Sequence, residues 1–94
     1  MSVLWTAEAL TEVEAIVEYI AADNPGAAIA LSSQIFDSVE TLLSDHPQAG
    51  RPGRVAGTRE LVVHASYVVA YRITNEGLQI LTVRHTARLW PEAF

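Results

Sequence analysis

Cysteine is absent from the 94 residues, so the chain forms no disulfide and offers no thiolate to a metal. No apolar run approaches the roughly 20 residues that a membrane-spanning helix needs. The N-terminus also lacks the basic start and long apolar stretch of a secretion signal. With half of its residues hydrophobic, the chain is long enough to bury a core. We therefore expect one domain, residues 1–94, in the cytoplasm and without a membrane partner.

Lysine is also absent, and arginine supplies every positive charge. All six arginines follow residue 50, whereas the first 50 residues carry eight acids and no base. The net charge of −5 argues against non-specific nucleic-acid binding, whose affinity comes largely from neutralised phosphates. We expect no direct sequence-specific binding of nucleic acid by this chain alone. A local arginine patch for one specific partner remains compatible with this composition.

Apolar spacing of three and four residues predicts two helices in the first half of the chain. The first is expected over about 7–22, with Thr6 as its N-cap. The second begins after Asn24 as N-cap, with Pro25 at the first helical position. Its stripe is formed by Ala28, Leu31, Ile35, Val39 and Leu42, with Phe36 and Leu43 widening it. The short connection between the two helices predicts an antiparallel pair.

The second half of the chain favours strands after a proline- and glycine-rich loop over 44–58. Strands are expected at about 59–65, 67–73 and 78–84, with a turn at 75–77. Such short connections require antiparallel neighbours. The run at 2–5 is either a further strand or a lead-in to the first helix. We expect an α+β fold in which the helical hairpin covers one face of the sheet.

The strands alternate poorly between apolar and polar residues, and this bears on the second face of the sheet. Leu61, Val62 and Val63 run together, and Val68, Val69 and Ala70 do the same. A sheet covered on one side only should alternate cleanly. We therefore expect the second face to be covered as well, by a partner chain.

Three segments, taken in this order and spacing, resemble the RelE/ParE superfamily of type II toxins: YIAADNPGAA, HPQAGRPGRVAGTRELVVHASYVVAYRI and ILTVRHTARLWP. The resemblance covers nearly the whole chain. It implies a helical hairpin on a small twisted antiparallel sheet. It also implies a cognate antitoxin, ParD-like or related, whose C-terminal segment wraps the toxin and neutralises it.

The superfamily divides by target, and the resemblance leaves two activities to weigh. RelE-like members cut mRNA in the ribosomal A site, whereas ParE-like members are known chiefly as poisons of DNA gyrase that act by binding. Val68 stands where ribonuclease members often carry arginine, lysine is missing, and no tyrosine follows Tyr71. The segments GTREL and HTARLWP resemble ParE-like members. We therefore expect a toxin that inhibits growth by binding, with gyrase as the expected target, and not an enzyme.

Candidate site residues follow from these alternatives. If the chain were a ribonuclease, His85 would act as acid or base, and Arg84 or Arg59 would hold phosphate. For target binding the candidates are Arg59, Arg84, His85, Arg88 and Trp90. A third reading, antitoxin binding without toxicity, would serve transcriptional autoregulation.

The antitoxin is expected to cover the acidic helix pair and the apolar sheet. Its candidate contacts are Leu10, Val13, Val17, Leu31, Ile35, Val62 and Val68. The histidines and acids are not spaced as metal ligands. No metal and no cofactor are therefore expected.

Overall fold

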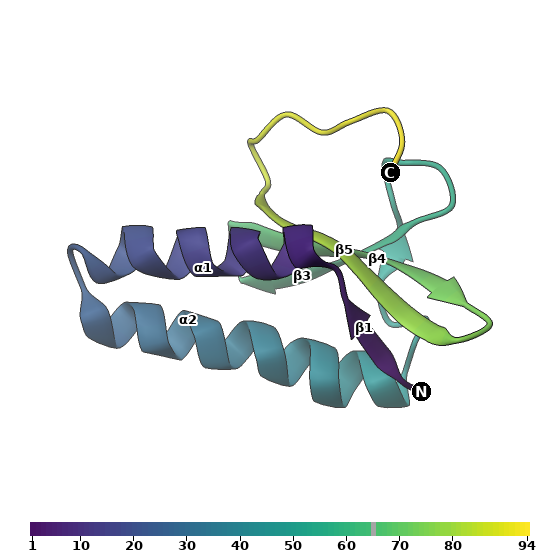
Figure 1. Cartoon of the computed structure of the whole chain (residues 1–94), viewed down its shortest axis with the longest axis horizontal. Helices are drawn as coiled ribbons and strands as arrows, with labels where there is room; N and C mark the ends of the chain where they lie inside the picture. Colours follow the sequence, from purple (N-terminus) through teal and green to yellow (C-terminus); the bar gives the residue numbers. More distant parts are fainter. Residues whose placement is uncertain (65) are drawn as a thin grey trace.

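The computed structural model describes residues 1–64 and 66–94, and the two helices lie against one face of a five-stranded sheet (Figure 1). The elements follow in the order β1 (Val3–Trp5), α1 (Ala7–Ala21), α2 (Pro25–Asp37), η1 (Ser38–Leu43), β2 (Arg51–Pro52), β3 (Arg59–His64), β4 (Tyr67–Thr74) and β5 (Gly77–His85). The α+β class and the helical hairpin are confirmed. The expected loop over 44–58 contains the two-residue strand β2, and the expected strand residue 65 lies outside the described residues.

Both helices begin at the predicted caps. The side chain of Thr6 accepts a hydrogen bond from the backbone N–H of Ala9 at 3.1 Å. Asn24 accepts one from the N–H of Ala27 at 3.0 Å, and Pro25 occupies the first turn of α2. These side chains satisfy backbone donors that have no partner within the helix. The local sequence therefore fixes where each helix starts.

The apolar stripe of α2 continues into η1, where one expected position is wrong. Leu43 is fully buried, whereas Leu42 is 41% exposed. The segment η1 is a π-helical turn, in which hydrogen bonds run from residue i to i+5. This wider winding brings the fourth residue after Val39 back to the core, instead of the third. Leu43 therefore takes the core position that the regular helical spacing gave to Leu42.

The sheet has the strand order β1-β5-β4-β3-β2, and β1 runs parallel to β5. The expected antiparallel meander of β3, β4 and β5 is confirmed, but the wholly antiparallel sheet is wrong. Because β1 pairs with a strand more than 70 residues later, no local turn sets its direction. Gly77 permits this approach, since a Cβ there would lie 2.3 Å from the carbonyl oxygen of Ser2.

The main core fills the space between the helices and the sheet. Its buried residues include Val13, Leu31 and Ile35 from the helices and Tyr71 and Val83 from the strands. The helices α1 and α2 thus cover one face of the sheet, which we call the helix face (Figure 1). The opposite face we call the second face.

The second face is covered in large part by the chain itself. Val68, Ala70 and Leu81 are buried but do not belong to the cluster beneath the helices. Figure 1 places the C-terminal tail and the connection before β3 on this side of the sheet. The expectation that a partner chain provides the cover is therefore wrong for these positions. Val62 is different, since it is 50% exposed.

Candidate functional site

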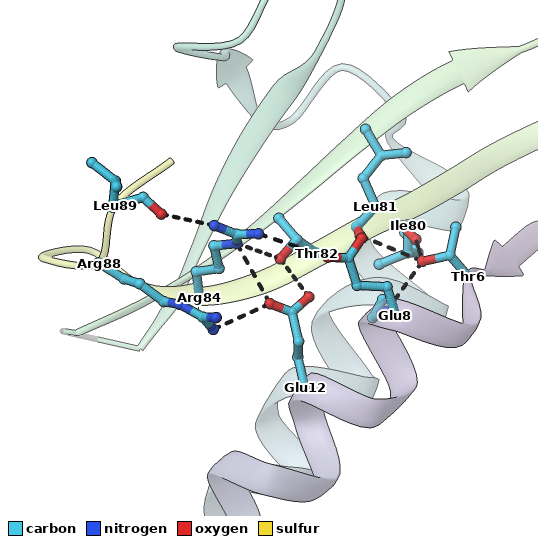
Figure 2. Close-up of polar contacts among 10 residues, drawn as sticks. Thr6, Glu8, Glu12, Ile80, Leu81, Thr82, Arg84, Arg88 and Leu89 are labelled. Carbon is cyan, nitrogen blue, oxygen red and sulfur yellow. Dashed lines mark hydrogen bonds and ion pairs between the residues drawn. The ribbon is translucent and has the colours of Figure 1, made fainter. Parts of the chain in front are cut away.

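A network of charged side chains joins α1 to the end of β5 (Figure 2). Glu12 reaches from α1 and accepts a hydrogen bond from the Thr82 hydroxyl at 2.5 Å. Its second carboxylate oxygen lies 3.4 Å from Arg84 Nε and 3.4 Å from Arg88 Nη1. Glu8, one turn earlier in α1, lies 3.8 Å from Arg84. Two carboxylates and two arginines therefore meet at this point.

Arg84 and Arg88, both predicted as target contacts, belong to this network. The side chain of Arg84 is only 11% exposed, and its Nε also donates to Thr82 Oγ1 at 2.8 Å. Arg88 is 59% exposed and therefore available to a partner. Glu12 was missed by the sequence analysis because its partners lie about 70 residues later. The readable signal is the spacing of Glu8 and Glu12, which places two acids on one helical face.

His85 lies beside this network and is exposed. Its ring meets that of Tyr67 edge-on, with 5.5 Å between centroids, and His64 lies on the other side of Tyr67 at 6.2 Å. His85, Tyr67 and Arg88 line an open groove together with Tyr19 of α1. The groove thus combines aromatic rings with one available cation. Tyr67 and Tyr19 were not among the predicted site residues.

Arg59, predicted as a target contact, is instead used inside the molecule. Its Nη2 donates to the carbonyl oxygens of Gln48 at 3.1 Å and Gly50 at 2.6 Å. Tyr71 holds the same segment, since its hydroxyl donates to Pro47 O at 2.6 Å and accepts from Gly50 N at 2.9 Å. Arg59 therefore anchors the connection between η1 and β2.

Glu60 follows Arg59 in β3, so its side chain leaves the strand on the opposite face, and it is buried. The backbone N–H of Arg54 donates to Glu60 at 2.7 Å, and the guanidinium of Arg54 donates at 3.2 and 3.3 Å. Arg51 adds a contact at 3.5 Å. Burial raises the pKa of Glu60, but the hydrogen bonds and charge of Arg54, with Arg51, outweigh it and lower the pKa below 4.5. Glu60 thus remains ionised and fixes the loop that precedes β3.

Trp90 packs on the chain's own arginines. The guanidinium carbon of Arg54 lies 4.2 Å from the centre of the indole ring, and that of Arg84 lies 5.7 Å from it. Such stacking of a cation over an aromatic face is attractive. Trp90 is partly buried and holds the tail to the body of the protein.

The predicted antitoxin contacts divide by exposure. Val13, Leu31, Ile35 and Val68 are at most 5% exposed and are not accessible in this fold. Leu10 is 42% exposed and Val62 is 50% exposed, while Val17 is partly buried. Leu10, Val17 and Phe36 line a groove between α1 and α2, and Glu14 and Glu18 border it. We call this the hairpin groove.

Two further features concern the described part of the chain, residues 1–64 and 66–94. No group of three or more histidines and acids there is arranged to hold a metal ion. No helix in it combines the length and apolarity that crossing a membrane requires.

Comparison with known proteins places this arrangement in a family. Residues 3–90 match the ParE toxin of type II toxin–antitoxin systems, parDE. The chain is 40% identical to Y4kP of Sinorhizobium fredii, a protein named as a candidate toxin, over 94% of this chain and 91% of that protein. It is 36% identical to Toxin RelE2 of Caulobacter vibrioides over 93% of this chain and 97% of that protein.

Solved structures agree with these sequence matches. A chain of the chromosomal ParDE system from P. aeruginosa superposes with a TM-score of 0.80 at 28% identity, covering 90% of this chain and 95% of that one. A chain of the RelBE2 toxin–antitoxin complex from Mycobacterium tuberculosis shares the fold, with a TM-score of 0.65 at 24% identity over 89% and 95% of the two chains. The chain therefore belongs to the ParE toxin family of type II toxin–antitoxin systems, within the RelE/ParE superfamily.

Proposed function

We propose that this toxin acts in the cytoplasm by binding DNA gyrase, without cutting nucleic acid itself, and that a ParD-like antitoxin restrains it. The observation that carries the choice of a binding mechanism is the placement of the ribonuclease candidates. Arg59 of β3 lies opposite Tyr71 of β4, whereas His85 of β5 lies opposite Tyr67 of β4. Four residues along a strand span about 13 Å, so Arg59 and His85 are too far apart to act on one phosphate.

Arg84 and Arg59 are both bound by other groups of the chain, which supports the same proposal. Catalysis of RNA cleavage requires cations aimed at the developing charge of the phosphoryl group. Arg84 is directed toward Glu12 and Glu8, and Arg59 toward two backbone carbonyls. Arg88 and His85 remain as exposed groups on the open groove, which suits a docking surface.

The alternative is a ribosome-dependent mRNA interferase. It is favoured by the 36% identity to a protein named Toxin RelE2, and by the exposed His85 beside Tyr67. In that case His85 would supply the acid or base, and Arg84 would have to leave Glu12 to reach phosphate.

Expression without antitoxin distinguishes the two. We expect growth arrest with gyrase-dependent DNA breaks and induction of the SOS response. Primer extension on translated transcripts should then reveal no new cuts in A-site codons. Cuts there, without DNA breaks, would establish the interferase. Normal growth under strong expression would instead indicate a chain that retains antitoxin binding alone.

The hairpin groove is the best-supported antitoxin contact. An apolar floor with Leu10, Val17 and Phe36 suits the apolar face of a helix laid into a groove. Because Glu14 and Glu18 border it, the matching antitoxin helix should carry lysine or arginine beside its apolar residues. The exposed Val62 offers a second contact on the other side of the sheet, which a wrapping segment can reach.

The groove is tested with two matched substitutions. Leu10 and Ile29 are both exposed apolar residues of the helices, but only Leu10 lines the groove. We expect Leu10→Glu to weaken antitoxin binding by roughly tenfold or more, and Ile29→Glu to leave it nearly unchanged. Isothermal titration calorimetry measures both affinities. Equal effects of the two substitutions would place the antitoxin elsewhere.

A further inference from the structure

The C-terminal residues 86–94, which we call the strap, cross the second face of the sheet. Figure 1 shows them rising from the end of β5 on the side opposite the helices and returning toward the connection before β3. Beneath this side lie Val68, Ala70 and Leu81, all buried. The strap and residues 53–58 are the described segments that Figure 1 places over this face. Burial of the second face therefore depends on the strap as well as on residues 53–58.

Side chains, and not backbone pairing, hold the outer part of the strap. Arg88 N donates to His85 O at 3.0 Å, and among the described residues no later backbone N–H donates to another backbone group. Beyond that point Arg84 donates to Leu89 O at 2.7 Å, and Trp90 stacks on Arg54. Both arginines are oriented in turn by carboxylates, Arg84 by Glu12 and Arg54 by Glu60.

The closed position also leaves a polar group unsatisfied. The indole N–H of Trp90 is buried and has no acceptor within the described residues. A buried donor without a partner is destabilising, and opening would return it to water. Leu89, next to it, is 88% exposed and adds little burial. Segments with few buried contacts and few backbone hydrogen bonds open at lower free energy than the whole fold.

We propose that the strap opens as a unit while the rest of the protein stays folded, and thereby gates the second face. Opening removes the stacking on Arg54 and the contact with Leu89 O. It thereby exposes one side of each guanidinium group, still paired with its carboxylate, beside an apolar floor that contains Val68. The proposal concerns the chain's own motion and does not depend on whether the target is gyrase or the ribosome.

The absence of cysteine makes a clean test possible, because a single introduced thiol reports on one position. Val68 and Val69 are adjacent in β4 and both fully buried, but Val69 belongs to the cluster beneath the helices. We expect the thiol of Val68→Cys to react with an aromatic disulfide reagent at least about tenfold faster than that of Val69→Cys. Opening of the strap is enough to expose the former, whereas the latter is exposed only when the core beneath the helices opens. Equal rates, after normalisation for the global stability of each variant, would overturn the proposal.

The stacking of Arg54 on Trp90 is tested with a second matched pair of substitutions. Arg54 and Arg51 both contact Glu60, but only Arg54 stacks on Trp90. Arg54→Gln should therefore accelerate labelling at Val68→Cys several-fold, and Arg51→Gln should do so much less. The same acceleration by both substitutions would contradict the role of the stacking.

A measurement without cysteine covers the case in which the thiol variants fold poorly. In Trp5→Phe the remaining tryptophan is Trp90, so its fluorescence reports on the strap directly. Arg54→Gln in this background should raise the acrylamide quenching constant, while far-UV circular dichroism stays unchanged. An unchanged quenching constant in Arg54→Gln would contradict the proposal that the stacking on Arg54 holds the strap closed.

Discussion

Replacing Glu60 with glutamine should destabilise the fold, because this carboxylate is buried and holds two arginines. Its side chain is 2% exposed and accepts three hydrogen bonds from Arg54 and one from Arg51. Removing one partner of a fully buried ion pair destabilises by about 3–5 kcal/mol. Arg54 is 39% exposed and Arg51 59%, so both regain water, and glutamine keeps one acceptor. We therefore expect about 2 kcal/mol, since a hydrogen bond to a charged group contributes roughly 1.5–3 kcal/mol.

The pH dependence separates the charge from the shape of the side chain. The pKa of Glu60 is lowered in the folded protein, so its stabilisation is fully present above the pKa of the unfolded chain. That stabilisation is lost as the pH falls through the lower, folded pKa. The difference between wild type and Glu60→Gln should therefore be constant near neutral pH and shrink below the ordinary value of 4.5.

Urea unfolding followed by circular dichroism measures this difference at pH 7 and at pH 3. A loss of about 2 kcal/mol corresponds to a melting temperature lower by roughly 8–16 °C for a domain of this size. Glu76→Gln in the exposed β4–β5 turn is the control and should change stability by less than about 0.5 kcal/mol. A variant as stable as wild type at pH 7, or a difference unchanged at pH 3, would refute the reasoning.

Four further substitutions test other parts of the structure. Tyr71→Phe removes both hydrogen bonds to the 47–50 segment and leaves buried groups unpaired, so thermal unfolding should show a loss of about 1–3 kcal/mol. Gly77→Ala should release β1, because its Cβ would lie 2.3 Å from Ser2 O; faster hydrogen exchange at Leu78, whose N–H donates to Ser2 O, would reveal this. Glu12→Gln should lower the free energy of unfolding by about 1–2 kcal/mol. Because the Arg88 side chain is largely exposed, Arg88→Gln should lower it by less than about 0.5 kcal/mol. Equal losses for the two variants in chemical denaturation would contradict the network of Figure 2.

The helices and the meander could be predicted because their signals are local. Caps at Thr6 and Asn24 and the spacing of apolar residues fix the helix starts and their buried sides. The direction of β1 could not be predicted, since its partner β5 lies far along the chain. Leu42 was wrongly predicted to face the core because the apolar spacing of the sequence does not indicate a π-helical turn.

The site was harder to predict than the fold. Arginine clusters suggest partners, but burial and pairing decide whether a guanidinium is free. Arg84 and Arg59 are used by Glu12 and by the 47–50 segment, contacts made across long stretches of sequence. The inner and outer sides of the helical hairpin are both apolar, so Leu31 and Ile35 could not be told from Leu10 without the packing.

Purified gyrase with supercoiled plasmid tests the central claim most directly. The proposed binding toxin should convert plasmid to linear DNA through trapped gyrase cleavage complexes, and added antitoxin should prevent this. The toxin without gyrase should leave the plasmid intact. Unchanged gyrase activity at saturating toxin, together with cutting of mRNA on purified ribosomes, would contradict the account.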